Sequence, residues 1–171
     1  MNCCTSAETT ALQETGNEPK VEIRAKCSQC AGASRYVTKK TMLLMLAPEL
    51  FEKISDGQYY FCSNFDCGIV YFPEQQETTF YTNDLRVRVG TKEKQDPKPL
   101  CYCFGFDESD FRDEINQTGQ TKILGRITEL LKAGMCACET RNPSGACCLG
   151  DITKTVKRLQ SERTPLGVKL C

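Results

Sequence analysis

The sequence QYYFCSNFDCGIVYF, which runs from Gln58 to Phe72, decides the fold of the first half of this chain. Aromatic and β-branched residues dominate both of its ends, which predicts two β-strands, Gln58–Cys62 and Gly68–Phe72. The polar run between them predicts a turn, and a cysteine stands on each side of that turn, at positions 62 and 67. The sequence therefore predicts a β-hairpin that presents two thiols.

A close cysteine pair upstream, Cys27 and Cys30, completes a set of four with Cys62 and Cys67. Two such pairs on tight turns can surround one tetrahedral ion, and the N–H groups of the turns stabilise the negative sulfurs. This spacing is typical of a structural Zn(Cys)4 site, which is closed and stabilises a small module. Two disulfides or four unliganded thiols are the alternatives, and Asp66 is the nearby carboxylate if one cysteine is not a ligand.

Thirteen of the 171 residues are cysteine and none is histidine, so a soft-metal site here must be built from thiolate. That selects zinc, iron–sulfur clusters and Cu(I). It excludes histidine-ligated haem, Rieske-type clusters and every Cys–His or Ser–His catalytic pair. An odd number of cysteines also fits a framework made only of disulfides poorly.

The chain shows no targeting or membrane signal. Residues 1–20 are polar, and the longest apolar run, Met42–Ala47, is far too short to span a bilayer. We therefore expect a cytoplasmic protein without membrane insertion, where thiols stay reduced and available to metals. The net charge is zero, with 22 basic and 22 acidic residues, and no basic block stands out. We expect no nucleic-acid partner, and the absence of a base or a nucleophile pair argues against an enzyme.

A second cysteine set follows, made of Cys101, Cys103, Cys138 and one of Cys147 or Cys148. Two sulfurs one residue apart, as in Cys101-Tyr102-Cys103, are too close for an ordinary zinc knuckle but suit two ligands on one iron of a cluster. Four thiolates from loops beside helix ends are what a [2Fe–2S] cluster needs. From spacing alone, a second zinc ion or a reactive dithiol pair stays equally open.

The chain divides by composition into four parts. Residues 1–20 lack periodicity and predict a disordered tail. We expect an α+β chain in which residues 21–96 form a small zinc-ribbon-like β module with a helix. Residues 97–162 then form a small helical domain, and residues 163–171 a loose end. The segment 91–100 is charged and holds two prolines, which indicates a linker.

Apolar spacing predicts the remaining elements. Residues Thr41–Ile54 have nearly helical spacing, although Pro48 argues against one continuous helix. Phe80 and Asp84–Val89 suggest further strand. Three helices are expected in the second half. Their boundary residues are Asp107 or Ser109 and Gly119 for the first, Thr121 and Gly134 for the second, and Asp151 at the start of the third.

Several strings together resemble the amino-terminal region of CopZ-type copper chaperones, over roughly residues 21–160. They are Tyr60-Phe61-Cys62, Val70-Tyr71-Phe72, Val87–Glu93, Lys98–Cys103 and Asn142–Cys148. The order of Cys-x-Cys, two short helices and a cysteine-bearing loop with a helix also resembles bacterioferritin-associated ferredoxin (BFD). The resemblance implies a zinc module with Cys27, Cys30, Cys62 and Cys67 as ligands, then a BFD-like [2Fe–2S] domain with Cys101, Cys103, Cys138 and Cys147 or Cys148.

This resemblance implies a metallochaperone or redox carrier in copper handling. The cluster would supply one electron to reduce Cu(II) to the transferable Cu(I), and a copper-transporting ATPase, a reductase or another redox partner would be its partners. The alternatives are a ferredoxin-like electron carrier without metal cargo and a zinc-stabilised interaction module whose second set also binds zinc. CopZ-type chaperones carry a following domain with a Cu(I)-binding Cys-x-x-Cys, which we expect this chain, ending at Cys171, to lack.

Five cysteines stand outside the two ligand sets: Cys3, Cys4, Cys136, Cys171 and the unused member of the pair at 147 and 148. The adjacent thiols of Cys3 and Cys4 could capture Cu(I) or Hg(II), both soft ions. The simpler interpretation, which we prefer, is exposed tail thiols without a selected role. Cys136 is a spare ligand or a buried thiol, and Cys171 is incidental.

Overall fold

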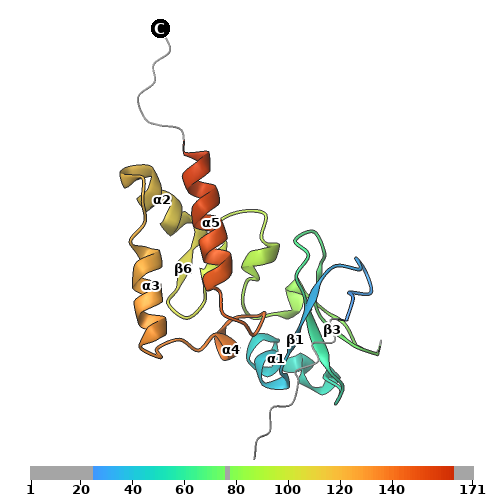
Figure 1. The fold of residues 1–171 in the computed structure, drawn as a ribbon. Helices are drawn as coiled ribbons and strands as arrows, with labels where there is room; N and C mark the ends of the chain where they lie inside the picture. The colour runs from blue at the N-terminus through green and yellow to red at the C-terminus, as the bar shows by residue number, and fades with distance from the viewer. Residues whose placement is uncertain (1–24, 76–77, 164–171) are drawn as a thin grey trace, which may run out of the picture.

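The computed structural model describes residues 25–75 and 78–163 (Figure 1). The tail predicted over 1–20, most of the predicted loose end, and Cys3, Cys4 and Cys171 lie outside these residues. The described chain forms an antiparallel sheet with short helices, followed by a mainly helical half, so the predicted α+β class is confirmed. No helix in this part of the chain is long and apolar enough to cross a membrane.

Four antiparallel strands form the sheet, in the order β1-β2-β3-β4. They are β1 (Ser34–Val37), β2 (Tyr59–Cys62), β3 (Ile69–Pro73) and β4 (Phe80–Tyr81). The predicted hairpin is confirmed, because β2 and β3 pair with Tyr60 opposite Phe72. Every residue of β2 and β3 is buried, since both faces of the sheet are covered.

The two faces bury different clusters because successive side chains of a strand point to opposite sides. Tyr59 and Phe61 pack into the larger cluster, together with the short helices. Tyr60 and Cys62 pack into a second cluster that contains Cys27. One face of the sheet is therefore covered by helices and the other by the cysteine-bearing loops.

Pro48 divides the segment that has helical spacing, as predicted. The α-helix α1 (Lys39–Met45) ends before it, and the 3-10 helix η1 (Pro48–Lys53) starts at it. Proline suits this first position because its missing N–H has no partner there anyway. Thr38 caps α1, since its hydroxyl accepts a hydrogen bond from the N–H of Thr41 at 3.1 Å.

The strand predicted over Asp84–Val89 is wrong. The chain forms a 3-10 helix, η2 (Thr82–Asp84), and in this described segment its β pairing is a single bridge between Leu46 and Leu85. The guanidinium of Arg86 donates to two carbonyls at the end of α1. The apolar alternation therefore reflects packing of an extended chain against the core, without a partner strand.

The second half packs around its own apolar cluster. Its elements are β5 (Pro99–Cys101), β6 (Phe106–Asp107), α2 (Glu108–Thr118), α3 (Ile123–Lys132), α4 (Cys138–Arg141) and α5 (Leu149–Glu162). The first predicted helix is confirmed, with Asp107 as its N-cap and Gly119 at its end in the left-handed region, with φ 80°. α5 begins at Leu149, earlier than the predicted start at Asp151. Neither the β5–β6 pair nor α4 was predicted.

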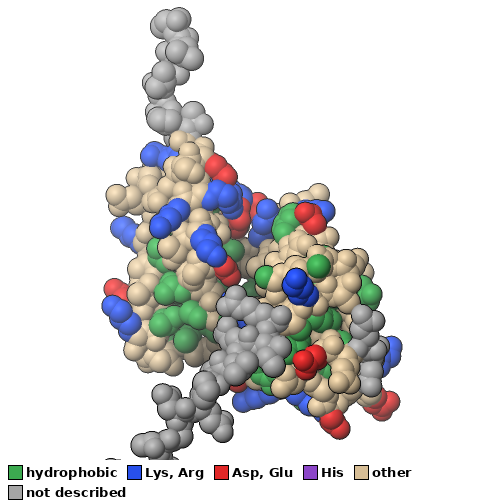
Figure 2. All heavy atoms as spheres, turned by 45° about the vertical axis from the view of Figure 1, so that its right-hand side comes forward, with side chains coloured by type: hydrophobic (Ala, Val, Ile, Leu, Met, Phe, Trp, Pro, Cys, Tyr) green, Lys and Arg blue, Asp and Glu red, His purple; other side chains and the backbone are tan. Residues whose placement is uncertain are grey.

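The segment 91–100, predicted as a linker, contains regular structure. The 3-10 helix η3 (Gly90–Lys92) opens it, and β5 begins at its end. Beside it, α4 packs against α1, and the hydroxyl of Thr41 donates to the carbonyl of Glu139 at 2.7 Å (Figure 1). The two halves are therefore in direct contact. Figure 2 shows charged side chains of both signs on their surface and an apolar area on the helical half.

Candidate metal centres

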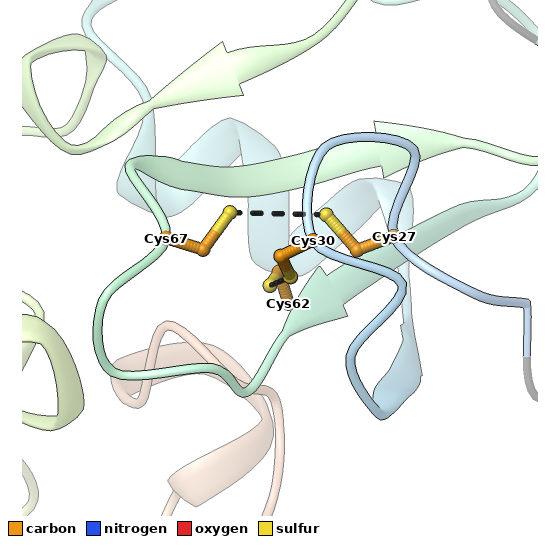
Figure 3. Close-up of side chains that lie close together, drawn as sticks. All are labelled: Cys27, Cys30, Cys62 and Cys67. Carbon is orange, nitrogen blue, oxygen red and sulfur yellow. Dashed lines mark hydrogen bonds between the residues drawn. The ribbon is translucent and has the colours of Figure 1, made fainter.

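The four cysteines of the first set meet beside the β2–β3 turn (Figure 3). Cys27 Sγ lies 3.9 Å from Cys67 Sγ, and Cys30 Sγ lies 3.6 Å from Cys62 Sγ. All four sulfur atoms lie within 4.8 Å of one another. One pair comes from the turn before β1 and the other from the two ends of the hairpin turn, so the structure brings both pairs to one point.

Local hydrogen bonds shape these turns. The N–H of Gly32 donates to Cys30 Sγ at 3.4 Å, which stabilises a thiolate. In the hairpin turn, the side-chain oxygen of Asn64 accepts from the N–H of Asp66 at 3.1 Å. The carboxylate of Asp66 is exposed and forms an ion pair with Lys94 at 3.4 Å, outside the sulfur group. Four sulfurs thus converge without a carboxylate substitute.

The distances between the sulfurs fit a tetrahedral ion. With Zn–S bonds of about 2.3 Å, two sulfurs of a tetrahedron lie about 3.8 Å apart. The observed distances of 3.6 and 3.9 Å fall on either side of this value. They are far longer than the S–S bond of a disulfide, about 2.05 Å. Four soft donors in this arrangement suit zinc or a single iron ion.

The thiols of the first set differ in their pKa values. Burial opposes ionisation of Cys30, but hydrogen bonds, that from Asn64 foremost, outweigh it and lower its pKa to about 6. Burial raises the pKa of Cys62 to about 12, against the opposing effects of a backbone hydrogen bond and of the charge of Lys92. Burial also raises the pKa of Cys67. A metal that binds all four as thiolates must therefore displace protons.

A lysine that the sequence analysis did not single out lies against this site. Lys92 is only 9% exposed, and its Nζ donates to the carbonyls of Asn64 and Cys67, at 2.9 Å each. The sequence did not predict burial of Lys92, because it lies in the charged segment 91–100 and a lysine in a charged run is usually solvated. The one signal that separates it from the exposed Lys94 is its place in the string Val87–Glu93, which resembles CopZ-type chaperones.

The second set forms two adjoining pairs. Cys103 Sγ lies 3.6 Å from Cys138 Sγ, and Cys101 and Cys148 are buried in one apolar cluster, where each thiol shifts the pKa of the other. The Cys-x-Cys spacing predicts instead that Cys101 and Cys103 share one iron. A tight turn, closed by the N–H of Gly105 on the carbonyl of Cys101 at 2.8 Å, directs the two thiols to different partners. Each pair therefore joins the first segment to the later loop.

The two sets differ in how their sulfurs are distributed. Among the described residues, the four sulfurs of the first set form one close group, all within 4.8 Å of one another, and the second set forms no such group of three or more ligands. A single ion draws its ligands to one point. A dinuclear cluster spreads four thiolates into one pair for each iron. The paired arrangement of the second set therefore suits two metal atoms better than one.

The structure distinguishes Cys147 from Cys148. Cys148 is 6% exposed, packs in the apolar cluster with Cys101 and directly precedes α5, whereas Cys147 is exposed. Cys136 is partly buried against the same cluster. Of the two neighbours, only Cys148 is thus brought to Cys101 as a pair.

Hydrogen bonds and burial also shift the pKa values of the second set. The hydrogen bond from Cys148 lowers the pKa of Cys101 to about 6, and the same bond, with burial, raises that of Cys148. Burial raises the pKa of Cys138 to about 12. The N–H of Ala137 donates to Cys103 Sγ at 3.3 Å, a contact that favours a bound thiolate.

Comparison with known proteins yields three similarities. Residues 24–86 match a CopZ-type family model described as a zinc binding domain. The chain is 37% identical over 123 residues to "Copper chaperone CopZ" of Archaeoglobus fulgidus, which is 72% of this chain and 57% of that protein. It therefore spans little more than half the length of that relative. The X-ray structure of the Archaeoglobus fulgidus CopZ N-terminal domain matches with a TM-score of 0.63 and 34% identity, over 75% of this chain and 95% of the domain.

Proposed function

This chain belongs to the family of the CopZ N-terminal domain, and we propose that it holds one structural zinc ion and one [2Fe–2S] cluster and serves as a metallochaperone and redox carrier in copper handling. The proposed zinc ligands are Cys27, Cys30, Cys62 and Cys67. The proposed cluster ligands are Cys101, Cys103, Cys138 and Cys148. The zinc module then corresponds to residues 21–96, and a BFD-like cluster domain to residues 97–162.

One observation carries this proposal: four sulfurs converge in the first set, and two pairs form in the second. If both sets held zinc, both would be expected to converge in the same way. Because the two sets share the same donor type, the difference in their geometry is the feature that supports our proposal of different metals.

A structural role suits the first site. Four thiolates complete the tetrahedral coordination sphere of a zinc ion and leave no open position for a substrate. The four cysteines would hold zinc between the turn before β1 and the β2–β3 turn, beside the small cluster around Tyr60, which is 1% exposed. This apolar cluster is too small to stabilise the module alone, so the free energy of metal binding would contribute to the stability of the fold.

The surroundings of the second set suit an iron–sulfur cluster. Its thiols lie at the edge of an apolar cluster formed with the fully buried Phe111 and Ile152, and the helices α2, α3 and α5 contribute to that cluster. Cys148 directly precedes α5, and a helix N-terminus stabilises the negative charge of a metal-bound thiolate beside it. Burial and the N–H contact to Cys103 are features that set the potential of such a cluster.

In copper handling, the reduced cluster would give one electron to Cu(II), which leaves an oxidised cluster and Cu(I), the form that thiolates bind well. A reductase would return the electron, and a copper-transporting ATPase would receive the ion. This role makes the protein a carrier and not an enzyme, in agreement with its similarity to a copper chaperone.

Anaerobic mixing with Cu(II) tests this function. Dithionite-reduced protein, freed of excess reductant, should give about one Cu(I) for each cluster oxidised, measured by a Cu(I)-specific chromophoric chelator and by the returning visible absorbance. Protein with an oxidised cluster is the control, because free thiols also reduce Cu(II). A cluster that stays reduced, with no Cu(I) above that control, would reject copper reduction and leave a ferredoxin-like electron carrier.

A further inference from the structure

A buried lysine lies beside the first cysteine set. Lys92 closes the 3-10 helix η3, and its Nζ donates 2.9 Å hydrogen bonds to the carbonyls of Asn64 and Cys67. The same ammonium lies 5.8 Å from the centroid of the Phe61 ring. All three contacts are with the hairpin that carries half of the first set. The lysine therefore ties the β2–β3 turn to the chain segment that follows the sheet.

The charge of Lys92 has no carboxylate partner in residues 25–75 and 78–163. The ion pairs of these residues involve other basic side chains. A buried ammonium is costly unless an opposite charge offsets it. Four thiolates around a divalent ion carry a net charge of about −2, and a site of this kind adjoins the lysine. The positive charge of Lys92 and the negative charge of the tetrathiolate site would then offset each other.

We propose that Lys92 is a positioning residue of the first metal site, which holds the turn between Cys62 and Cys67 in its binding geometry and offsets the negative charge of the bound tetrathiolate. This inference rests on the proposed zinc site. It adds a residue outside the four ligands, one that acts through the backbone of Asn64 and Cys67 and through its charge.

The other end of η3 is anchored to the second cysteine set. The N–H of Gly90 donates to the hydroxyl of Tyr102 at 2.8 Å, and that hydroxyl donates to the carbonyl of Arg88 at 3.1 Å. Tyr102 stands between Cys101 and Cys103. A side chain at position 90 would place its Cβ 1.8 Å from the carbonyl oxygen of Pro99, so only glycine fits this close approach. One short helix thus connects the two metal sites.

Four variants of the full chain separate the roles of the lysine: Lys92→Met, Lys92→Gln, Lys92→Arg and Lys94→Met. Gln retains a hydrogen-bond donor without the charge, and Arg retains both. Lys94→Met is the matched control, because Lys94 also contacts this turn, through Asp66, but its side chain is 70% exposed. Zinc affinity is measured by competition with a chromophoric chelator, with circular dichroism as a check that each variant is folded.

We expect Lys92→Met and Lys92→Gln to lower zinc affinity about 10- to 100-fold, as loss of residues that support metal ligands does. Lys92→Arg should recover most of that loss, and Lys94→Met should match the wild type. Wild-type zinc affinity in Lys92→Gln would overturn the role of the charge. If Lys92→Met is unfolded, the zinc affinities of Lys92→Gln and Lys92→Arg are compared instead. A wild-type protein without zinc would reject the metal site itself, whereas zinc of equal affinity in every variant would reject only the role of Lys92.

Discussion

The hydroxyl of Tyr71 donates a buried 2.7 Å hydrogen bond to the carbonyl of Pro143. Tyr71 lies in β3 of the sheet and is fully buried, and Pro143 lies in the loop that leads to Cys148. Thr41 makes a parallel contact, because its hydroxyl donates to the carbonyl of Glu139 at 2.7 Å. The sheet and α1 thus support the segment that carries half of the second cysteine set.

Replacement of Tyr71 by Phe removes this support. The carbonyl of Pro143 loses its partner in a buried place, which costs about 1–3 kcal/mol of unfolding free energy. Urea denaturation of Tyr71→Phe, with the exposed Tyr81→Phe as the control, measures the cost. Equal stability of the two variants would show that the contact adds nothing.

High pH should destabilise the fold through Tyr102. Burial raises the pKa of Tyr102 to about 12, above its ordinary value of about 10. The folded state therefore holds this proton more tightly than the unfolded state. Its contribution is fully present below pH 10 and is lost as the pH rises toward 12. Unfolding free energy measured across this window should fall less in Tyr102→Phe than in the wild type, and identical slopes would contradict this assignment.

Zinc binding should release protons. Burial raises the pKa of Cys62 to about 12 and also raises that of Cys67, so both are thiols at neutral pH without metal. Both must ionise to bind, so about two or more protons leave and the apparent affinity rises with pH, roughly 100-fold for each unit. Calorimetry in buffers of different ionisation enthalpy counts these protons. Heats that do not depend on the buffer would contradict the expectation.

The neighbours Cys147 and Cys148 should differ in their effect on iron. We expect Cys148→Ser to lose the visible absorbance and the iron of the second site, because it removes the partner of Cys101. Cys147→Ser, which changes an exposed thiol one residue away, should retain both. Loss of iron in Cys147→Ser but not in Cys148→Ser would instead identify Cys147 as the ligand.

Local sequence signals predicted the elements that depend on neighbouring residues. The aromatic and β-branched residues on both sides of Ser63–Asp66 specified the hairpin, and Asp107 with Gly119 specified the ends of α2. Pro48 marked the break after α1. The strand expected over residues 84–89 failed because apolar alternation reports which side is buried and does not supply a partner strand.

The spacing of the cysteine pairs predicted one meeting of distant residues, that of Cys27 and Cys30 with Cys62 and Cys67. Other contacts between distant residues were beyond such reasoning. The pairing of Cys103 with Cys138 joins residues 35 positions apart, and Thr41 reaches Glu139 across 98 positions. The spacing of Cys101 and Cys103 suggested a shared iron, but their partners depend on how the later loop folds back. Lys92 was hidden for the same reason, since its carbonyl partners lie 25 and 28 positions away.

Metal analysis of the purified protein, combined with an EPR spectrum after reduction by dithionite, tests the central assignment most directly. We expect about two iron and one zinc per chain, red-brown protein that bleaches on reduction, and the signal of a reduced [2Fe–2S] cluster. Colourless protein with two zinc ions and no iron would contradict the division of the cysteines into a zinc site and a cluster site.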